Sequence, residues 1–161
     1  MRRDRYDNTL STSSDAARDH YIAALDLLLA GDAGIADRFQ KAVDADPDFV
    51  LAHVGLARGL PYEGKMAAAT DEMVAARLAK GARTDREASH LNAMDLLVQG
   101  KSAEAYAAIR THVADHPRDA LVAQTCSSVF GLIGFSGKPG REAEILAYTS
   151  ALLPHYGEDW W

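Results

Sequence analysis

Apolar residues recur three or four positions apart over most of the chain after residue 15, which is the spacing of one face of an α-helix. The first such segment places Ala16, Ala23, Ala24 and Leu27 on one face together with His20. Glycines, prolines and polar caps interrupt the pattern at regular intervals. The segments between these interruptions predict eight helices, over residues 15–30, 32–45, 49–60, 65–80, 84–99, 102–115, 117–133 and 141–153.

The interruptions themselves are periodic. Four glycines recur roughly every 34 residues, which is the length of a tetratricopeptide (TPR) repeat: Gly31, Gly64, Gly100 and Gly137. A proline follows three of them half a period later: Pro47, Pro117 and Pro154. Glycine ends a helix because it adopts positive φ without strain, and proline ends one because it lacks an N–H. The pattern predicts an all-α, TPR-like solenoid of about four antiparallel hairpins; the alternative is an all-α bundle of another topology.

Polar caps support these helix boundaries. Ser13 or Ser14 is a suitable N-cap for the first helix, with Asp15 in its first turn. Thr84 and Glu87 have the spacing of a capping box. Residues 1–14 are polar and are interpreted as a lead-in, followed by a single helical-repeat domain over 15–161.

Four short segments are more specific together than singly: LSTSSDAA (10–17), DADPDFVLAH (44–53), RTDREASHLNA (83–93) and ADHPRDAL (114–121). In this order they resemble the N-terminal part of the tetratricopeptide repeat protein 38 family. The resemblance implies an all-helical TPR-like solenoid and carries no assigned chemistry. Because members of that family are longer, it also implies that the domain is truncated at its C-terminal end.

Composition narrows the functional classes. Of the 161 residues 48% are apolar and 7% aromatic, and alanine and leucine supply much of the apolar share, which suits close-packed helices. The net charge of −6 argues against nucleic-acid binding, which requires a basic surface. No apolar run is long enough for a membrane span, the N-terminus lacks the apolar stretch of a secretory signal, and there is one cysteine. These features predict a cytoplasmic protein.

In TPR arrays the first helix of each hairpin lines a concave face, and this face predicts the binding site. The positions expected there are largely apolar: Tyr21, Leu25, Leu28, Leu51, Val54, Arg58, Tyr62, His90, Met94, Leu97, Leu121, Gln124 and Ser128. An apolar groove of this kind fits an amphipathic helix of a protein or peptide partner, or a small hydrophobic ligand. The alternative is that the protein's own helices bury these residues.

Several polar residues are candidates for chemistry. An inter-repeat pocket formed by His20, His53, Glu87 and His90 would favour an enzyme or a small-molecule binder.

His112 and His116 have a spacing that suits zinc or nickel, with Asp115 and Asp119 nearby. Packing at a helix end explains these histidines better, and we expect no metal and no cofactor. Cys126 lies among small and apolar residues without a base beside it and is predicted to be a buried thiol.

The sequence therefore favours a non-enzymatic TPR-like interaction module with an apolar concave groove, and the histidine-lined pocket is the alternative. The segment after the last helix, HYGEDWW, ends in Trp160 and Trp161 and leaves an apolar end uncovered. We expect this end to form a homodimer interface, or else the tail to fold back into the groove.

Overall fold

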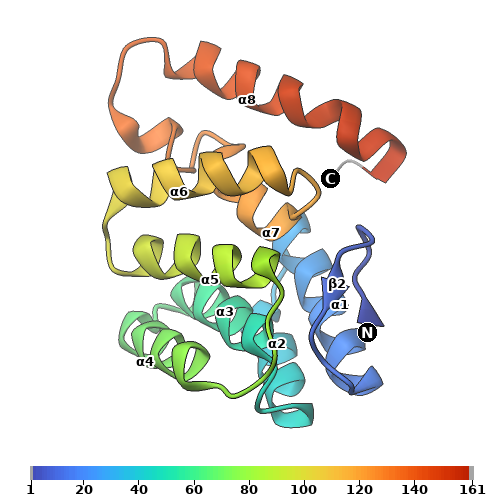
Figure 1. Ribbon diagram of the computed structural model, residues 1–161. Coiled ribbons are helices and arrows are strands. Elements are labelled where there is room, and N and C mark those ends of the chain that lie inside the picture. Colours follow the sequence, from blue (N-terminus) through green and yellow to red (C-terminus); the bar gives the residue numbers. More distant parts are fainter. Residues whose placement is uncertain (1, 160–161) are drawn as a thin grey trace.

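The computed structural model describes residues 2–159. Within that range it contains eight α-helices (Figure 1): α1 (Asp15–Ala30), α2 (Ile35–Ala45), α3 (Val50–Gly59), α4 (Met66–Leu78), α5 (Asp85–Val98), α6 (Ser102–Asp115), α7 (Ala120–Ala123) and α8 (Arg141–Tyr156). Short 3-10 turns accompany them: η1 (Leu60–Glu63), η2 (Gln124–Cys126), η3 (Gly134–Ser136) and η4 (Gly157–Asp159). The all-α class predicted from the sequence is confirmed.

Consecutive helices pack in pairs, α1 with α2, α3 with α4 and α5 with α6. Helix α3 is central, because it also contacts α1, α2 and α5. In Figure 1 helices α5, α6 and α8 follow one another away from the part of the molecule formed by α1 to α4. Helix α3 is buried along almost its whole length, including residues on all of its sides, so it forms the middle of the core.

The predicted turn residues behave as their chemistry requires. The four periodic glycines all adopt positive φ, between 69° and 75°. Ser14 caps α1 by accepting a hydrogen bond from the Ala17 N–H, and Thr84 and Glu87 form the complete capping box of α5. The regular spacing of these signals therefore sets where the first six helices begin and end.

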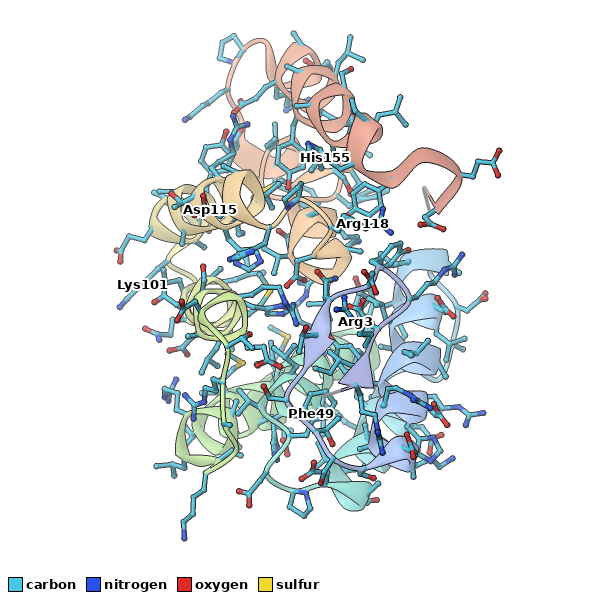
Figure 2. The ribbon with its side chains drawn as sticks, turned by 45° about the vertical axis from the view of Figure 1, so that its right-hand side comes forward. Arg3, Phe49, Lys101, Asp115, Arg118 and His155 are labelled. Atoms are coloured by element: carbon cyan, nitrogen blue, oxygen red, sulfur yellow. The ribbon has the colours of Figure 1, made fainter. Side chains whose placement is uncertain are left out.

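The N-terminal segment is not only a polar lead-in. Strands β1 (Arg2–Arg3) and β2 (Thr9–Leu10) pair antiparallel in a small hairpin, which is the one sheet among residues 2–159. Tyr6 and Leu10 are fully buried. Figure 2 shows the hairpin lying between α1 and α5, with Arg3 on it. Two-residue strands have too few positions for an alternating pattern, so no periodic signal predicts them.

The seventh helix is much shorter than the predicted 117–133. It ends at Ala123, and the chain continues through η2 into a compact loop. Ser127 donates its hydroxyl hydrogen to the Gln124 carbonyl, and Leu132 N–H returns to the Thr125 carbonyl. Serine side chains compete with the helical hydrogen bonds of the backbone, and Gly131 and Gly134 allow the chain to pass close to earlier carbonyls. These residues, and not the apolar pattern, decide the local structure.

Helix α8 continues past the predicted end at Pro154, to Tyr156. Proline removes one hydrogen bond, but in the last turn few such bonds remain to be lost. Tyr156 is buried and its ring packs edge-on against Tyr6 of the hairpin, with 5.4 Å between centroids, which stabilises the added turn. Trp160 and Trp161, predicted to form an interface, lie outside the described residues.

A close approach between α2 and α3 depends on a glycine. A Cβ built on Gly55 would lie 2.2 Å from the ring of Phe39, which is itself fully buried. We therefore expect Gly55→Ala to lower the free energy of unfolding by about 1–3 kcal/mol through overpacking, measured by urea denaturation. Phe39→Leu should recover part of that loss in the double variant, because it removes the ring that the new methyl meets. Additive losses would show that the two residues are not coupled.

Candidate ligand-binding site

Most residues predicted for a concave groove are inside the core. Eight of them are buried: Tyr21, Leu25, Leu28, Leu51, Val54, His90, Met94 and Leu121. Apart from that of His90, their side chains belong to the hydrophobic core of the domain. Arg58, Tyr62, Leu97, Gln124 and Ser128 keep part of their surface. A binding site built from the predicted set must therefore use these remaining residues.

Three of them line one half-open cavity of about 430 Å³. The cavity lies between the end of α3, the η1 turn, α4 and the end of α5, and its lining is mainly apolar: Ala57, Arg58, Pro61, Tyr62, Met66, Ala69, Thr70, Leu97 and Val98. Tyr62 and Met66 are more than 60% exposed, so the cavity opens between them and solvent. Its volume lies in the range of small-molecule pockets, about 300–1,000 Å³.

Arg58 is the charged group of this cavity. Its Nη2 donates to the Gln124 Oε1 at 3.0 Å, whereas its Nε is buried and has no hydrogen-bond partner among the described residues. Burial lowers the pKa of Arg58 below its usual value, and only Tyr62 and Cys126 oppose that effect; no carboxylate acts on it. A guanidinium stays charged in proteins, so a positive charge stands here without a counter-charge.

A second cavity contains charged groups of both signs. It lies between α6 and α8, and both Arg110 and Glu144 line it, so positive and negative groups are present together. Arg110 also lies over the rings of Tyr106 and Tyr148, at 5.9 and 5.6 Å from their centroids. The isolated charge therefore distinguishes the Arg58 cavity from its neighbour.

The largest buried polar cluster centres on Asp119, which precedes α7. Its Oδ2 accepts from Arg86 Nη1 at 2.5 Å and from His90 Nδ1 at 2.9 Å, and His112 Nε2 lies 3.2 Å away. Ser89 contacts the other nitrogen of His112 at 2.9 Å. Burial alone would raise the pKa of Asp119, but His90, His112 and Arg86 hold it well below its usual value. We call Arg86, His90, His112 and Asp119 the Asp119 cluster.

The ligand atoms of His90, His112 and Asp119 all lie within 4.8 Å of one another, a spacing that a metal ion could bridge. The guanidinium of Arg86 contacts the same carboxylate oxygen and would repel a cation at that position. His116, which the sequence paired with His112, stacks near it with 5.1 Å between ring centroids and is not in this group. The Asp119 carboxylate is paired in an ion-pair network, whereas His90 Nε2 and His112 Nε2 are buried without a hydrogen-bond partner among the described residues. The absence of a metal stays a prediction.

The four residues of the alternative pocket do not converge. His53 lies 2.8 Å from Glu72 Oε2 and 2.9 Å from the Pro47 carbonyl. Glu87 accepts from the Ser11 N–H and hydroxyl as well as serving the α5 cap. His90 belongs to the Asp119 cluster and His20 lies half-exposed on α1.

Cys126 is buried, as predicted, and burial raises the pKa of its thiol to about 11. The thiolate is the nucleophilic form, so a thiol with this pKa is almost wholly protonated and unreactive at neutral pH. Among the polar groups singled out in the sequence, His112 lies within hydrogen-bond distance of a hydroxyl, that of Ser89 at 2.9 Å.

The sequence analysis did not predict the pairing of Asp119 with Arg86 or the cavity beside Arg58. Asp119 was noted only as a neighbour of His112 and His116, and Arg86 was not noted. Arg86 and His90 are four residues apart on α5, the spacing of one helix face, which was the available signal. The cavity at Arg58 had no such signal, because its walls come from three separate helices.

Comparison with known proteins adds no functional assignment: no family model, curated protein or solved structure matches the chain.

Among residues 2–159, no helix combines the length and the apolar character that crossing a bilayer requires.

Removing the carboxylate of Asp119 should be strongly destabilising. Asp119→Asn leaves the Arg86 charge buried without its partner, and we expect the free energy of unfolding at pH 7 to fall by about 3–5 kcal/mol. The lowered pKa means that the carboxylate stabilises the fold above the unfolded-state pKa of about 3.9 and loses this effect as the pH falls below it. The difference between wild type and variant should therefore shrink below about pH 4.

Urea denaturation from pH 7 to pH 3 measures this dependence. The matched control is Asp32→Asn in the exposed α1–α2 loop, which should change stability by less than about 0.5 kcal/mol. A loss at Asp119 no greater than that of the control would contradict the role assigned to the cluster.

Proposed function

We propose that this protein is a non-enzymatic, TPR-like helical-repeat binding module whose ligand site is the cavity beside Arg58. The observation that carries the proposal is a charged guanidinium without a counter-charge in the wall of an otherwise apolar, half-open cavity. Pockets of this size with apolar walls and a few polar groups are the usual form of small-molecule sites. The cavity therefore suits an apolar ligand group better than the flat contact of a partner helix.

The absence of catalysis is part of the proposal. Asp119 is committed to Arg86 and His90, Glu87 to the cap of α5 and to Ser11, and His53 to Glu72. Catalytic acids and bases need access to a substrate, and fully buried, paired groups lack it. The periodic turns and the paired packing of α1 to α6 support the TPR-like arrangement.

Binding of a neutral apolar probe tests the site. N-phenyl-1-naphthylamine fluoresces strongly in apolar surroundings, and we expect the wild-type protein to bind it in the cavity. Thr70 is exposed and lines the cavity, so Thr70→Phe should fill the opening without disturbing the core. We expect this variant to bind the probe about tenfold more weakly, equivalent to about 1.4 kcal/mol.

Thr111→Phe places the same ring on an exposed position of α6 outside the cavity and serves as the control. Melting temperatures verify that both variants are folded. Unchanged probe binding by Thr70→Phe, or equal weakening by both variants, would reject the cavity as the site.

A second candidate function, association through the C-terminal part of the domain, is favoured by exposed apolar side chains there. Leu146 and Leu153 of α8 and Phe130 and Phe135 of the preceding loop are each more than half exposed. Apolar residues gathered in one region of a surface are typical of protein interfaces. A second copy related by twofold symmetry is the occupant we propose, as expected from the sequence.

Sedimentation velocity at micromolar concentration tests this association. We expect the wild type to sediment as a dimer of the 17.4 kDa chain and Leu146→Glu as a monomer. Leu78→Glu, at an equally exposed leucine on α4, should leave the dimer intact. A monomeric wild type would eliminate this candidate.

A further inference from the structure

Arg58 and Arg86 differ in whether a carboxylate compensates the charge of their guanidinium group. Arg86 Nη1 contacts Asp119 at 2.5 Å and its Nη2 donates to the Thr9 carbonyl, so its charge is compensated. Arg58 has the Gln124 amide oxygen at 3.0 Å as its hydrogen-bond acceptor and no acidic neighbour. A neutral amide can satisfy an N–H group but cannot compensate a charge.

The position of Arg58 gives that charge access to a ligand. The residue is half-buried and lines the cavity, so a ligand in the cavity lies beside its side chain. Its Nη1 makes no hydrogen bond to any described residue. An isolated charge at the edge of a low-dielectric cavity attracts an anion more strongly than the same charge in water, because screening is weaker there.

The remaining walls limit what the anion can be. The other lining side chains carry no charge, and no second arginine or lysine lies among them. A single guanidinium balances a single negative charge, whereas a phosphate would keep an uncompensated charge. Met66, Ala69, Leu97 and Val98 provide an apolar surface for a hydrocarbon group attached to the anion.

We propose that the cavity binds a monocarboxylate that carries an apolar chain, with its carboxylate hydrogen-bonded to the Arg58 guanidinium and its chain between η1, α4 and α5. This inference rests on the proposed function and specifies the ligand class of the same site. Guanidinium and carboxylate form charge-assisted hydrogen bonds, which are shorter and stronger than neutral ones. Tyr62 lines the same cavity and is exposed to solvent.

Octanoate and octanamide are the probes, because they share the same chain and nearly the same shape but differ in charge. Isothermal titration at pH 7 should show octanoate binding at least about tenfold more tightly than octanamide. In ¹H–¹⁵N spectra of the wild type, octanoate should shift the Arg58 Nε–H resonance and octanamide should shift it much less. N-acetyl-leucine, in which the carboxylate lies next to an amide, separates a free acid from a peptide C-terminus as the source.

Arg58→Gln should abolish the preference for octanoate, and Arg58→Lys should retain part of it because the charge is kept. Arg38→Gln, at an exposed arginine of α2, is the matched control and should leave the preference unchanged. The wild-type spectra test the contact even if Arg58→Gln does not fold.

Equal affinity for octanoate and octanamide, or a preference that survives Arg58→Gln, would overturn the inference. If both probes and N-phenyl-1-naphthylamine bind, but without a preference for charge, the cavity remains a binding site and only the carboxylate is refuted. If none of the three binds, the proposed function fails as well. Tighter binding of N-acetyl-leucine than of octanoate would contradict the free acid as the ligand.

Discussion

The buried carboxylate of Asp119 is the interaction on which the packing of the second half of the domain depends. It lies directly before α7 and contacts Arg86 and His90 of α5 and His112 of α6. One negative charge thereby fixes the mutual positions of three elements. Its partners are aligned by their own helices, and the attraction is strong because water is excluded. The single turn of α7 follows Asp119 directly, and its residues 120–123 are all buried.

The same cluster also holds the N-terminal hairpin. Arg86 donates to the Thr9 carbonyl with the nitrogen that Asp119 does not use, and the next residue, Glu87, accepts from Ser11. The first turn of α5 is therefore the attachment point of a segment that is more than seventy residues away in the chain. This attachment converts a polar stretch without periodicity into an ordered part of the core.

The features that could be predicted from the sequence are those decided by neighbouring residues. Gly31, Gly64 and Gly100 end helices because of their own backbone freedom, and the Thr84–Glu87 box needs only three residues of spacing. The Asp119 cluster and the cavity beside Arg58 could not be predicted, because each depends on how separate helices are placed relative to one another. Most groove residues lie in the helices predicted for them, although Gln124 and Ser128 follow α7 and Tyr62 lies in η1. Their accessibility depends on how tightly those elements pack. The length of α7 was overestimated because the prediction followed the apolar pattern and did not take account of Ser127, Ser128 and two glycines.

Arg118 joins two segments that an open stack of helix pairs would keep apart. Its Nε donates to the Tyr6 carbonyl and its Nη1 to the His155 carbonyl at 2.5 Å, and Figure 2 shows Arg118 and His155 close together beside the hairpin. In a linear repeat array each unit contacts only its neighbours and the ends can unfold independently. Through Arg118, residues 6 and 155 are linked, so α8 is joined to the hairpin as well as to its neighbours in the chain. The domain is thus tied into a closed ring of contacts, and it should unfold as one cooperative unit.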